Sequence, residues 1–212
     1  MNLSDVINNY ASGVYSHMNW EDERVVFNFL HNNVGDVHLL EPMLRSEDFS
    51  SQYAACYIIS ETGQDANDLL HLINPLLGSA NFAVRNIALE CYRWHAKKTE
   101  EYFDALILLN DKEWVVRTTV SWVISEMNRF EIEGCIDFLN ANNHSDVAMS
   151  LKRCLNINLS DVVNGVLNLN DLSNIDLIVL YGLLYTSEYD KFDYIDYFIN
   201  TGREDWQWFK KF

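Results

Sequence analysis

Hydrophobic residues recur at helical rather than strand spacing through the middle of the chain. Two stretches each place four apolar residues on one helical face: Val84, Ile87, Ala88 and Cys91, then Val116, Val120, Val123 and Ile124. Three amphipathic segments lie beside these stretches. Residues 68–77 precede the first stretch, residues 100–109 precede the second, and residues 132–139 follow the second. The pattern predicts helical hairpins, each made of a helix, a short polar turn and a second helix.

The polar turns recur at a nearly constant period. Residues 39–49 align with residues 72–82, and the chain's two prolines, Pro42 and Pro75, fall at matching positions. The polar residues expected to cap or begin the second helices follow one another at steps of 33, 32 and 33 residues: Asp48, Asn81, Glu113 and Asp146. A fixed period of this length is typical of stacked helical repeats that bury one continuous core.

The second helices resemble those of the HEAT repeat. Two copies, NFAVRNIA at 81–88 and EWVVRTTV at 113–120, carry the Val-Arg pair and following small residue of that repeat, whereas the first copy has Gln52 at the arginine position. The resemblance covers about residues 36–156. It implies an all-α fold, a right-handed α-solenoid of HEAT-like helical hairpins, that binds other macromolecules along one face. It also implies that the two arginines, Arg85 and Arg117, bridge adjacent repeats and are structural rather than catalytic.

The segments outside the repeats are helical but do not keep the period. Helices are expected at residues 6–14, 24–31, 159–169, 175–185 and 192–200. Such irregular ends suit the capping elements that a solenoid requires. Because no linker rich in Pro, Gly or Ser interrupts the chain, we expect a single domain over 1–212. It would comprise an N-terminal cap (1–35), the HEAT-like repeats (36–156) and C-terminal helices (157–212).

The charge balance is strongly acidic. Thirty-one acidic and fifteen basic residues give a formal net charge of −16. A protein that tracks a nucleic-acid backbone needs Lys and Arg to replace counterions, so we expect no nucleic-acid partner. The surplus of acid favours one basic protein partner, or else only keeps the chain soluble. No apolar run is long enough to span a membrane and the first residues do not resemble a signal peptide, so we expect no membrane contact and a cytoplasmic location.

The sequence contains no recognisable catalytic constellation. The six histidines show no metal-ligand spacing, and no nucleotide-binding or hydrolase motif is present, so we expect no metal, no cofactor and no enzymatic activity. The four cysteines are widely spaced among apolar residues and are interpreted as reduced core thiols. DNA glycosylases with HEAT-like folds exist, but their DNA-facing surface should be basic.

Aromatic and acidic residues suggest two candidate binding surfaces. The first follows the predicted second helices outside their apolar stripes: Tyr53, Tyr57, Glu61, Glu90, Trp122 and Glu126. The second is a Tyr/Asp-rich segment near the C-terminus: Tyr189, Asp193, Asp196 and Tyr197. The alternative is that the rings pack between layers and the carboxylates form a solvated helix face.

Small size, acidity and the absence of catalytic motifs favour a non-enzymatic binding protein. The leading hypothesis is a bacterial immunity protein of the contact-dependent growth inhibition type, which would neutralise a basic toxin domain such as a nuclease. An adaptor or regulatory subunit of a larger complex is the second hypothesis. A degenerate HEAT-like DNA glycosylase is the third.

Overall fold

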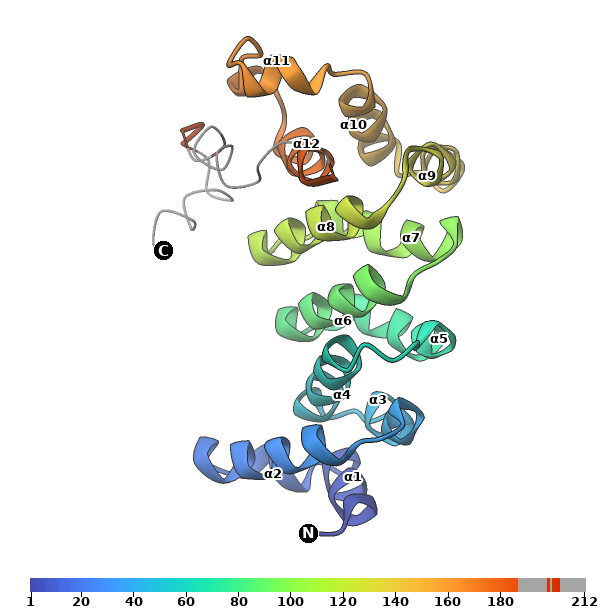
Figure 1. The fold of residues 1–212 in the computed structure, drawn as a ribbon, viewed down its shortest axis with the longest axis vertical. Helices are drawn as coiled ribbons and strands as arrows, with labels where there is room; N and C mark the ends of the chain where they lie inside the picture. Colours follow the sequence, from blue (N-terminus) through green and yellow to red (C-terminus); the bar gives the residue numbers. More distant parts are fainter. Residues whose placement is uncertain (187–197, 199, 203–212) are drawn as a thin grey trace. The chain divides into compact units, whose positions relative to one another are not determined.

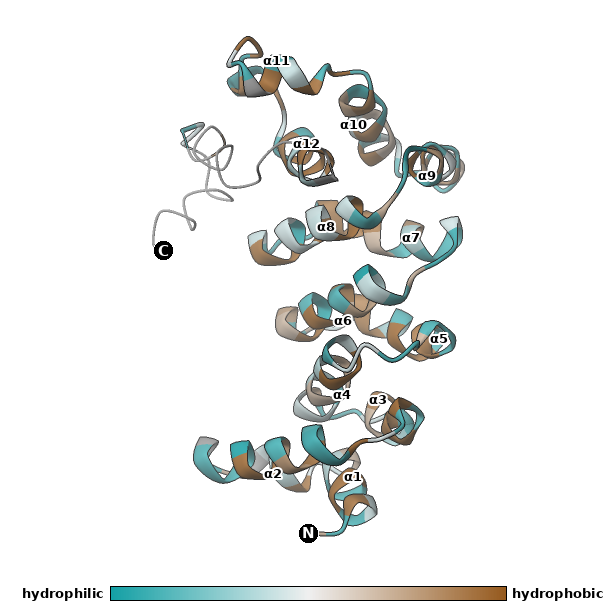
Figure 2. Ribbon diagram, in the orientation of Figure 1, coloured by the Kyte–Doolittle hydropathy of each residue, from teal (hydrophilic) through white to brown (hydrophobic). Residues whose placement is uncertain are grey.

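The structure is a computed structural model that describes residues 1–186, 198 and 200–202. Among these residues it contains α-helices and short 3₁₀ helices and no strand, so the predicted all-α, solenoid-like class is confirmed (Figure 1). Residues change from apolar to polar around most helices, as amphipathic packing requires (Figure 2). No helix within the described residues is long and apolar enough to cross a membrane. The chain divides into two compact units, Met1–Lys97 and Lys98–Phe212.

The first unit is built from helical hairpins around a layer of fully buried aliphatic side chains. Its α-helices are α1 (Leu3–Ala11), α2 (Trp20–Asn33), α3 (Glu41–Leu44), α4 (Phe49–Glu61), α5 (Leu70–Ile73) and α6 (Phe82–His95). Four 3₁₀ segments complete it: Val14–His17, Val37–Leu40, Asn67–Leu69 and Asn74–Gly78. The second helices of successive repeats, α4 and α6, pack along each other, and Ile58, Ile59 and Leu89 are fully buried.

The second unit continues with hairpins but does not keep the regular order. Its α-helices are α7 (Thr99–Leu106), α8 (Trp114–Glu126), α9 (Arg129–Ala141), α10 (Ser145–Leu155), α11 (Leu159–Val163) and α12 (Asn174–Thr186). Its 3₁₀ segments are Ile107–Asn110 and Leu169–Asp171. Helix α12 packs along α8 and also contacts α10, so this helix lies inside the core of the unit. The cause is the run Leu177, Ile178, Val179 and Leu180, which is fully buried and needs apolar neighbours on several sides.

The repeat period is expressed in one recurring hydrogen bond. In three successive repeats a side chain near the start of the second helix donates to the backbone carbonyl six residues earlier: Gln52 to Ser46, Arg85 to Ser79 and Arg117 to Asp111, at 2.6, 2.7 and 2.6 Å. These bonds give the two arginines a structural role and join each helix to the turn of its own repeat, whereas the resemblance implied a bridge between adjacent repeats. Glutamine in the first copy performs the same task as arginine in the next two.

The turn residues predicted from the period also occupy the expected places. Asp48 and Asn81 are N-caps whose side chains accept hydrogen bonds from Ser51 N–H and Ala83 N–H. Glu113 is the N-cap residue of α8, and the last member of the series lies in the first turn of α10. The helix predicted at 175–185 agrees with α12. The helix predicted at 159–169 is wrong beyond Val163, because α11 ends there and, after Gly165 with its φ of +67°, the chain forms the separate 3₁₀ segment Leu169–Asp171. The helix expected at 192–200 lies largely outside the described residues.

The close approach of α12 to α8 depends on the absence of a side chain at Gly182. A Cβ atom there would lie 2.6 Å from the Ser121 carbonyl oxygen and 2.9 Å from Ile124 Cβ. Because the nearest atom belongs to the backbone, the Gly182→Ala variant must separate the two helices, and we expect it to lower the free energy of unfolding by about 2 kcal/mol. Urea unfolding followed by circular dichroism measures this loss. The Gly78→Ala control has open space around the added methyl group and should change stability by less than about 0.5 kcal/mol. Equal losses in both variants would contradict the packing argument.

Candidate functional site

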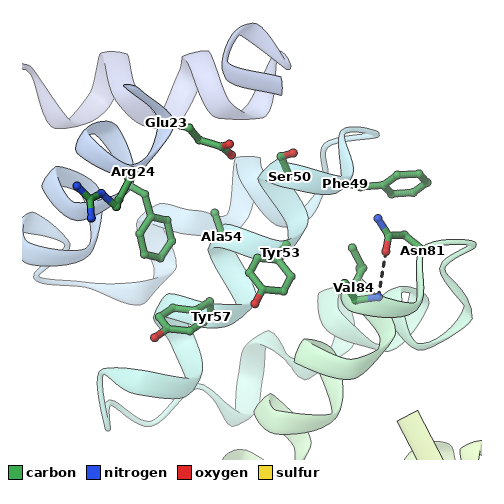
Figure 3. Close-up of a pocket in the computed structure, with 11 residues that line it drawn as sticks. Glu23, Arg24, Phe49, Ser50, Tyr53, Ala54, Tyr57, Asn81 and Val84 are labelled. Atoms are coloured by element: carbon green, nitrogen blue, oxygen red, sulfur yellow. Dashed lines mark hydrogen bonds between the residues drawn. The ribbon is translucent and has the colours of Figure 1, made fainter. Parts of the chain in front are cut away.

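Helices α2, α4 and the start of α6 line an open cleft of about 450 Å³ in the first unit (Figure 3). Helix α2 contributes Glu23, Arg24 and Phe27, α4 contributes Phe49, Ser50, Tyr53, Ala54 and Tyr57, and the beginning of α6 contributes Asn81, Ala83 and Val84. The volume lies in the range of pockets that hold small molecules in proteins. The cleft is therefore a candidate ligand site of this unit. A second hollow of about 500 Å³, lined by Glu61, Trp94 and Lys97 among others, lacks the cluster of aromatic rings described next.

Aromatic rings form a connected cluster in the cleft. Tyr53 and Tyr57 lie one turn apart on α4, with ring centroids 6.4 Å apart and planes inclined by 25°. Phe27 meets Tyr57 edge to face at 5.5 Å, and His31, one turn further along α2, lies 6.4 Å from Tyr57. Tyr53 and Phe49 remain exposed, by 40% and 44%. The cluster thus offers ring surface to a flat ligand without having to open.

Two lining residues carry charge, and neither is neutralised by its surroundings. Glu23 is half-buried and Arg24 is exposed. Neither side chain has a hydrogen bond or an ion pair to any residue that the structure describes. A partly desolvated carboxylate without a partner costs stability, and such costs are typical of functional sites. Burial, with a contribution from Tyr57, raises the pKa of Tyr53, so its phenol remains a neutral hydrogen-bond donor.

The residues proposed from the sequence are distributed over several places. Tyr53 and Tyr57 line the cleft, as a binding role requires. Glu61 and Glu90 do not line it: Glu90 lies 3.7 Å from Arg93, and burial raises its pKa, with a smaller contribution from Glu61. Trp122 and Glu126 belong to α8 in the second unit, half-buried and exposed respectively. The C-terminal candidates lie outside the described residues: Tyr189, Asp193, Asp196 and Tyr197.

Sequence reasoning missed the wall of the cleft that α2 provides. This helix was expected only as part of an N-terminal cap, although Glu23, Phe27 and His31 follow at steps of four residues and so share one helical face. An aromatic and acidic face on a capping helix was the available signal. It becomes meaningful only when that helix packs beside α4.

The described residues contain no group of three or more His, Cys, Asp or Glu side chains that could hold a metal ion. The four cysteines are free and buried, as expected for core thiols. Burial raises the pKa of Cys135 and of Cys154 to about 12 and that of Cys91 well above its usual value. Because the thiolate is the reactive form, these thiols are not suited to act as nucleophiles.

Comparison with known protein families gives one match. Residues 52–156, just under half of the chain, match the family described as DNA alkylation repair enzymes. The matched segment includes the α6 wall of the cleft and the part of the α4 wall that carries Tyr53 and Tyr57, but neither Phe49 and Ser50 nor the α2 wall. No match to the chain was found among the curated proteins or among the solved structures.

This match corrects the functional part of the sequence analysis. The hypothesis of a toxin immunity protein is wrong, because the matched family consists of DNA repair enzymes. The expectations of no enzymatic activity and no nucleic-acid partner are contradicted by the same finding. The error came from net charge, which sums the whole chain, whereas a DNA site depends on a few local side chains. Over residues 52–156, therefore, the chain is similar to the DNA alkylation repair enzymes.

Proposed function

We propose that this protein is a DNA repair enzyme of the glycosylase type, which binds DNA and releases an alkylated base. The match of residues 52–156 to the DNA alkylation repair enzymes is the observation that carries this proposal. A DNA substrate also agrees with the cytoplasmic location expected from the sequence. The cleft is the proposed place of reaction, because its α6 wall and most of its α4 wall belong to the matched segment.

The aromatic cluster supplies what an alkylated base needs. A purine that carries an alkyl group on a ring nitrogen is flat and positively charged. The faces of Phe27, Tyr53 and Tyr57 can stack on such a ring, and aromatic faces attract a cation in addition. The exposed rings at the cleft therefore favour a charged base over a normal, uncharged one.

The carboxylate of Glu23 gives the cleft a role in bond breaking. When the bond between the sugar and the charged base breaks, its electron pair leaves with the base, and positive charge develops on the sugar. A half-buried carboxylate beside the sugar would stabilise that charge. Water then adds to the sugar carbon and loses a proton to solvent, which completes a hydrolysis whose products are the free base and an abasic site.

The acidity of the chain affects how DNA is held. A net charge of −16 repels phosphates and weakens binding that does not depend on the base. Most of the affinity must then come from contacts to the altered nucleotide itself. We expect weak binding to undamaged duplex DNA and measurable binding only at low salt.

The Tyr57→Ala variant tests the assignment of the cleft. Removing a stacking ring should weaken binding to methylated DNA by about 1–2 kcal/mol, or roughly five- to thirtyfold, since one base–aromatic stack contributes about 1–3 kcal/mol. Fluorescence anisotropy with DNA treated with a methylating agent measures the affinity. Chromatography and mass spectrometry of the same DNA measure the released base.

The Tyr57→Phe variant is the matched control, because it keeps the ring and removes only the hydroxyl group. We expect it to bind within about twofold of the unchanged protein, since stacking uses the ring face. If Tyr57→Ala binds and reacts like the unchanged protein, the cleft is not the site. If the unchanged protein releases no base and binds neither methylated nor unmethylated DNA at low salt, the proposed function is wrong.

A further inference from the structure

Most basic side chains of the first unit are occupied within the protein. Four of the five Lys and Arg residues between positions 1 and 97 have partners: Arg45 lies 3.6 Å from Glu41, Arg85 donates to the Ser79 carbonyl at 2.7 Å, Arg93 lies 3.7 Å from Glu90, and Lys97 lies 2.6 Å from Asp65. The fifth is Arg24, which has no hydrogen bond or ion pair to a described residue. The free guanidinium of this unit is thus the one beside the aromatic cleft.

Arg24 and Glu23 are adjacent in sequence but serve different sides of the cleft. In Figure 3 the Glu23 side chain extends toward Ser50, whereas the Arg24 side chain extends in the opposite direction. The Glu23 charge also acts on α1, where burial and, secondarily, this charge raise the pKa of Tyr10. The two charges therefore do not cancel each other, and the guanidinium remains available to an anion at the edge of the ring cluster.

From this arrangement we infer that the cleft holds one nucleotide of an unpaired DNA strand, with its base on the aromatic cluster and its phosphate on Arg24. The inference rests on the proposed function and names the form of DNA that enters the site. A guanidinium is planar and presents paired N–H groups that match the oxygen spacing of a phosphate. Arg24 lies three residues before Phe27 on α2, so a guanidinium and an aromatic ring share one helix face. The two groups match the two chemically distinct halves of a nucleotide, its phosphate and its base.

The supply of free cations argues for a single strand rather than an intact duplex. Proteins that bind duplex DNA through its backbone, without base contacts, neutralise many phosphates, and each such contact needs a Lys or Arg. The first unit offers one such side chain at the cleft. Single strands are bound mainly by stacking of exposed bases on aromatic rings, and a base in an unpaired region need not first be extracted from a duplex.

The salt dependence of binding distinguishes a phosphate contact from general attraction. The probe is a short, fluorescein-labelled single strand of deoxyadenylates, with affinity measured by anisotropy over a series of salt concentrations. Loss of one phosphate contact reduces the slope of log affinity against log salt by about 0.7 for a single strand. We expect that reduction in Arg24→Ala and a nearly unchanged slope in Arg24→Lys, which keeps the charge. The control Arg45→Ala removes the same charge from an exposed residue that does not line the cleft, and it should keep the slope.

Three results would overturn the inference: identical slopes for the unchanged protein and Arg24→Ala, equal reductions for Arg24→Ala and Arg45→Ala, or tighter binding to the paired form of the strand. Competition by free AMP at the same concentration as the strand's own nucleotides would assign the site to a free nucleotide instead. Base release from methylated DNA keeps the two proposals apart. If the protein releases the alkylated base but Arg24→Ala leaves the salt slope unchanged, only the phosphate contact is contradicted. If the slope depends on Arg24 but no base is released, only the proposed repair activity is contradicted.

Discussion

Replacing Glu23 by glutamine should slow the release of an alkylated base about a hundredfold. Glu23 is half-buried in the aromatic cleft and has no hydrogen bond or ion pair to a described residue, so its charge is available to the substrate. Loss of one preorganised electrostatic stabiliser typically lowers the rate by about 10²–10³. Glutamine keeps the size of the side chain and removes the charge. The measurement is the single-turnover rate of base release from methylated DNA, with the affinity determined in parallel.

Glu21 provides a control on the same helical turn. It is exposed, does not line the cleft, and its replacement by glutamine changes the net charge of the chain by the same amount. Glu21→Gln should leave the rate within about twofold, because a fully hydrated charge outside the site is screened by solvent. If both variants slow the reaction equally, the effect belongs to the overall charge of the protein. An unchanged rate in Glu23→Gln would remove Glu23 from the proposed mechanism.

The Arg153→Ala variant should lose about 3 kcal/mol of folding free energy. Arg153 donates from a terminal guanidinium nitrogen to Asp176 Oδ2 at 2.6 Å, and the Asp176 side chain is completely buried. Asp176 Oδ2 also accepts a hydrogen bond from Ser173 N–H, while Oδ1 has no partner. Removing one member of a buried ion pair costs about 3–5 kcal/mol, because the other charge stays buried. The lower end of that range applies, since the Arg153 side chain is itself 54% exposed and water can take part of its place.

Urea unfolding followed by circular dichroism measures the loss, and Lys152→Ala is the matched control. Lys152 is the exposed neighbour of Arg153 on α10, so its removal changes the charge equally but leaves the Asp176 pair intact. We expect Lys152→Ala to stay within about 0.5 kcal/mol of the unchanged protein. A further Asp176→Asn change on top of Arg153→Ala should recover part of the loss, because it removes the uncompensated charge. A loss below about 1 kcal/mol in Arg153→Ala would contradict the buried-pair argument.

The two largest effects fall on residues that were not chosen from the sequence. Glu23 belongs to a helix that was expected to be a cap, and Asp176 lies in a segment that was expected to be an irregular end. Each residue is one of many acids in a strongly acidic chain, and the only local signal is the face that Glu23 shares with Phe27 and His31. Burial and the presence or absence of a partner set it apart, and both are properties of packing.

The sequence by itself determined the helical hairpins, their period and the chemistry of their turns. The spacing of apolar residues depends on neighbours three and four positions away, and an N-cap such as Asp48 or Asn81 acts on N–H groups two or three residues later. The same locality made Tyr53 and Tyr57 recognisable as a pair, because one helix places residues four apart on one face. These features follow from short stretches of chain and need no knowledge of the remaining fold.

Only the tertiary structure decided how α12 packs on α8 and how the cleft is assembled. The cleft unites Glu23, Arg24 and Phe27 with Tyr57 and Val84, residues as much as sixty positions apart, and no local pattern specifies which helices become neighbours. It also decided which charges are neutralised, because ion pairs form between side chains that only packing brings together. Net charge predicted repulsion of nucleic acids, whereas one unpaired guanidinium beside a ring cluster supports a nucleotide site. The physical reason is that electrostatic energy depends on distance and burial, which a residue count does not contain.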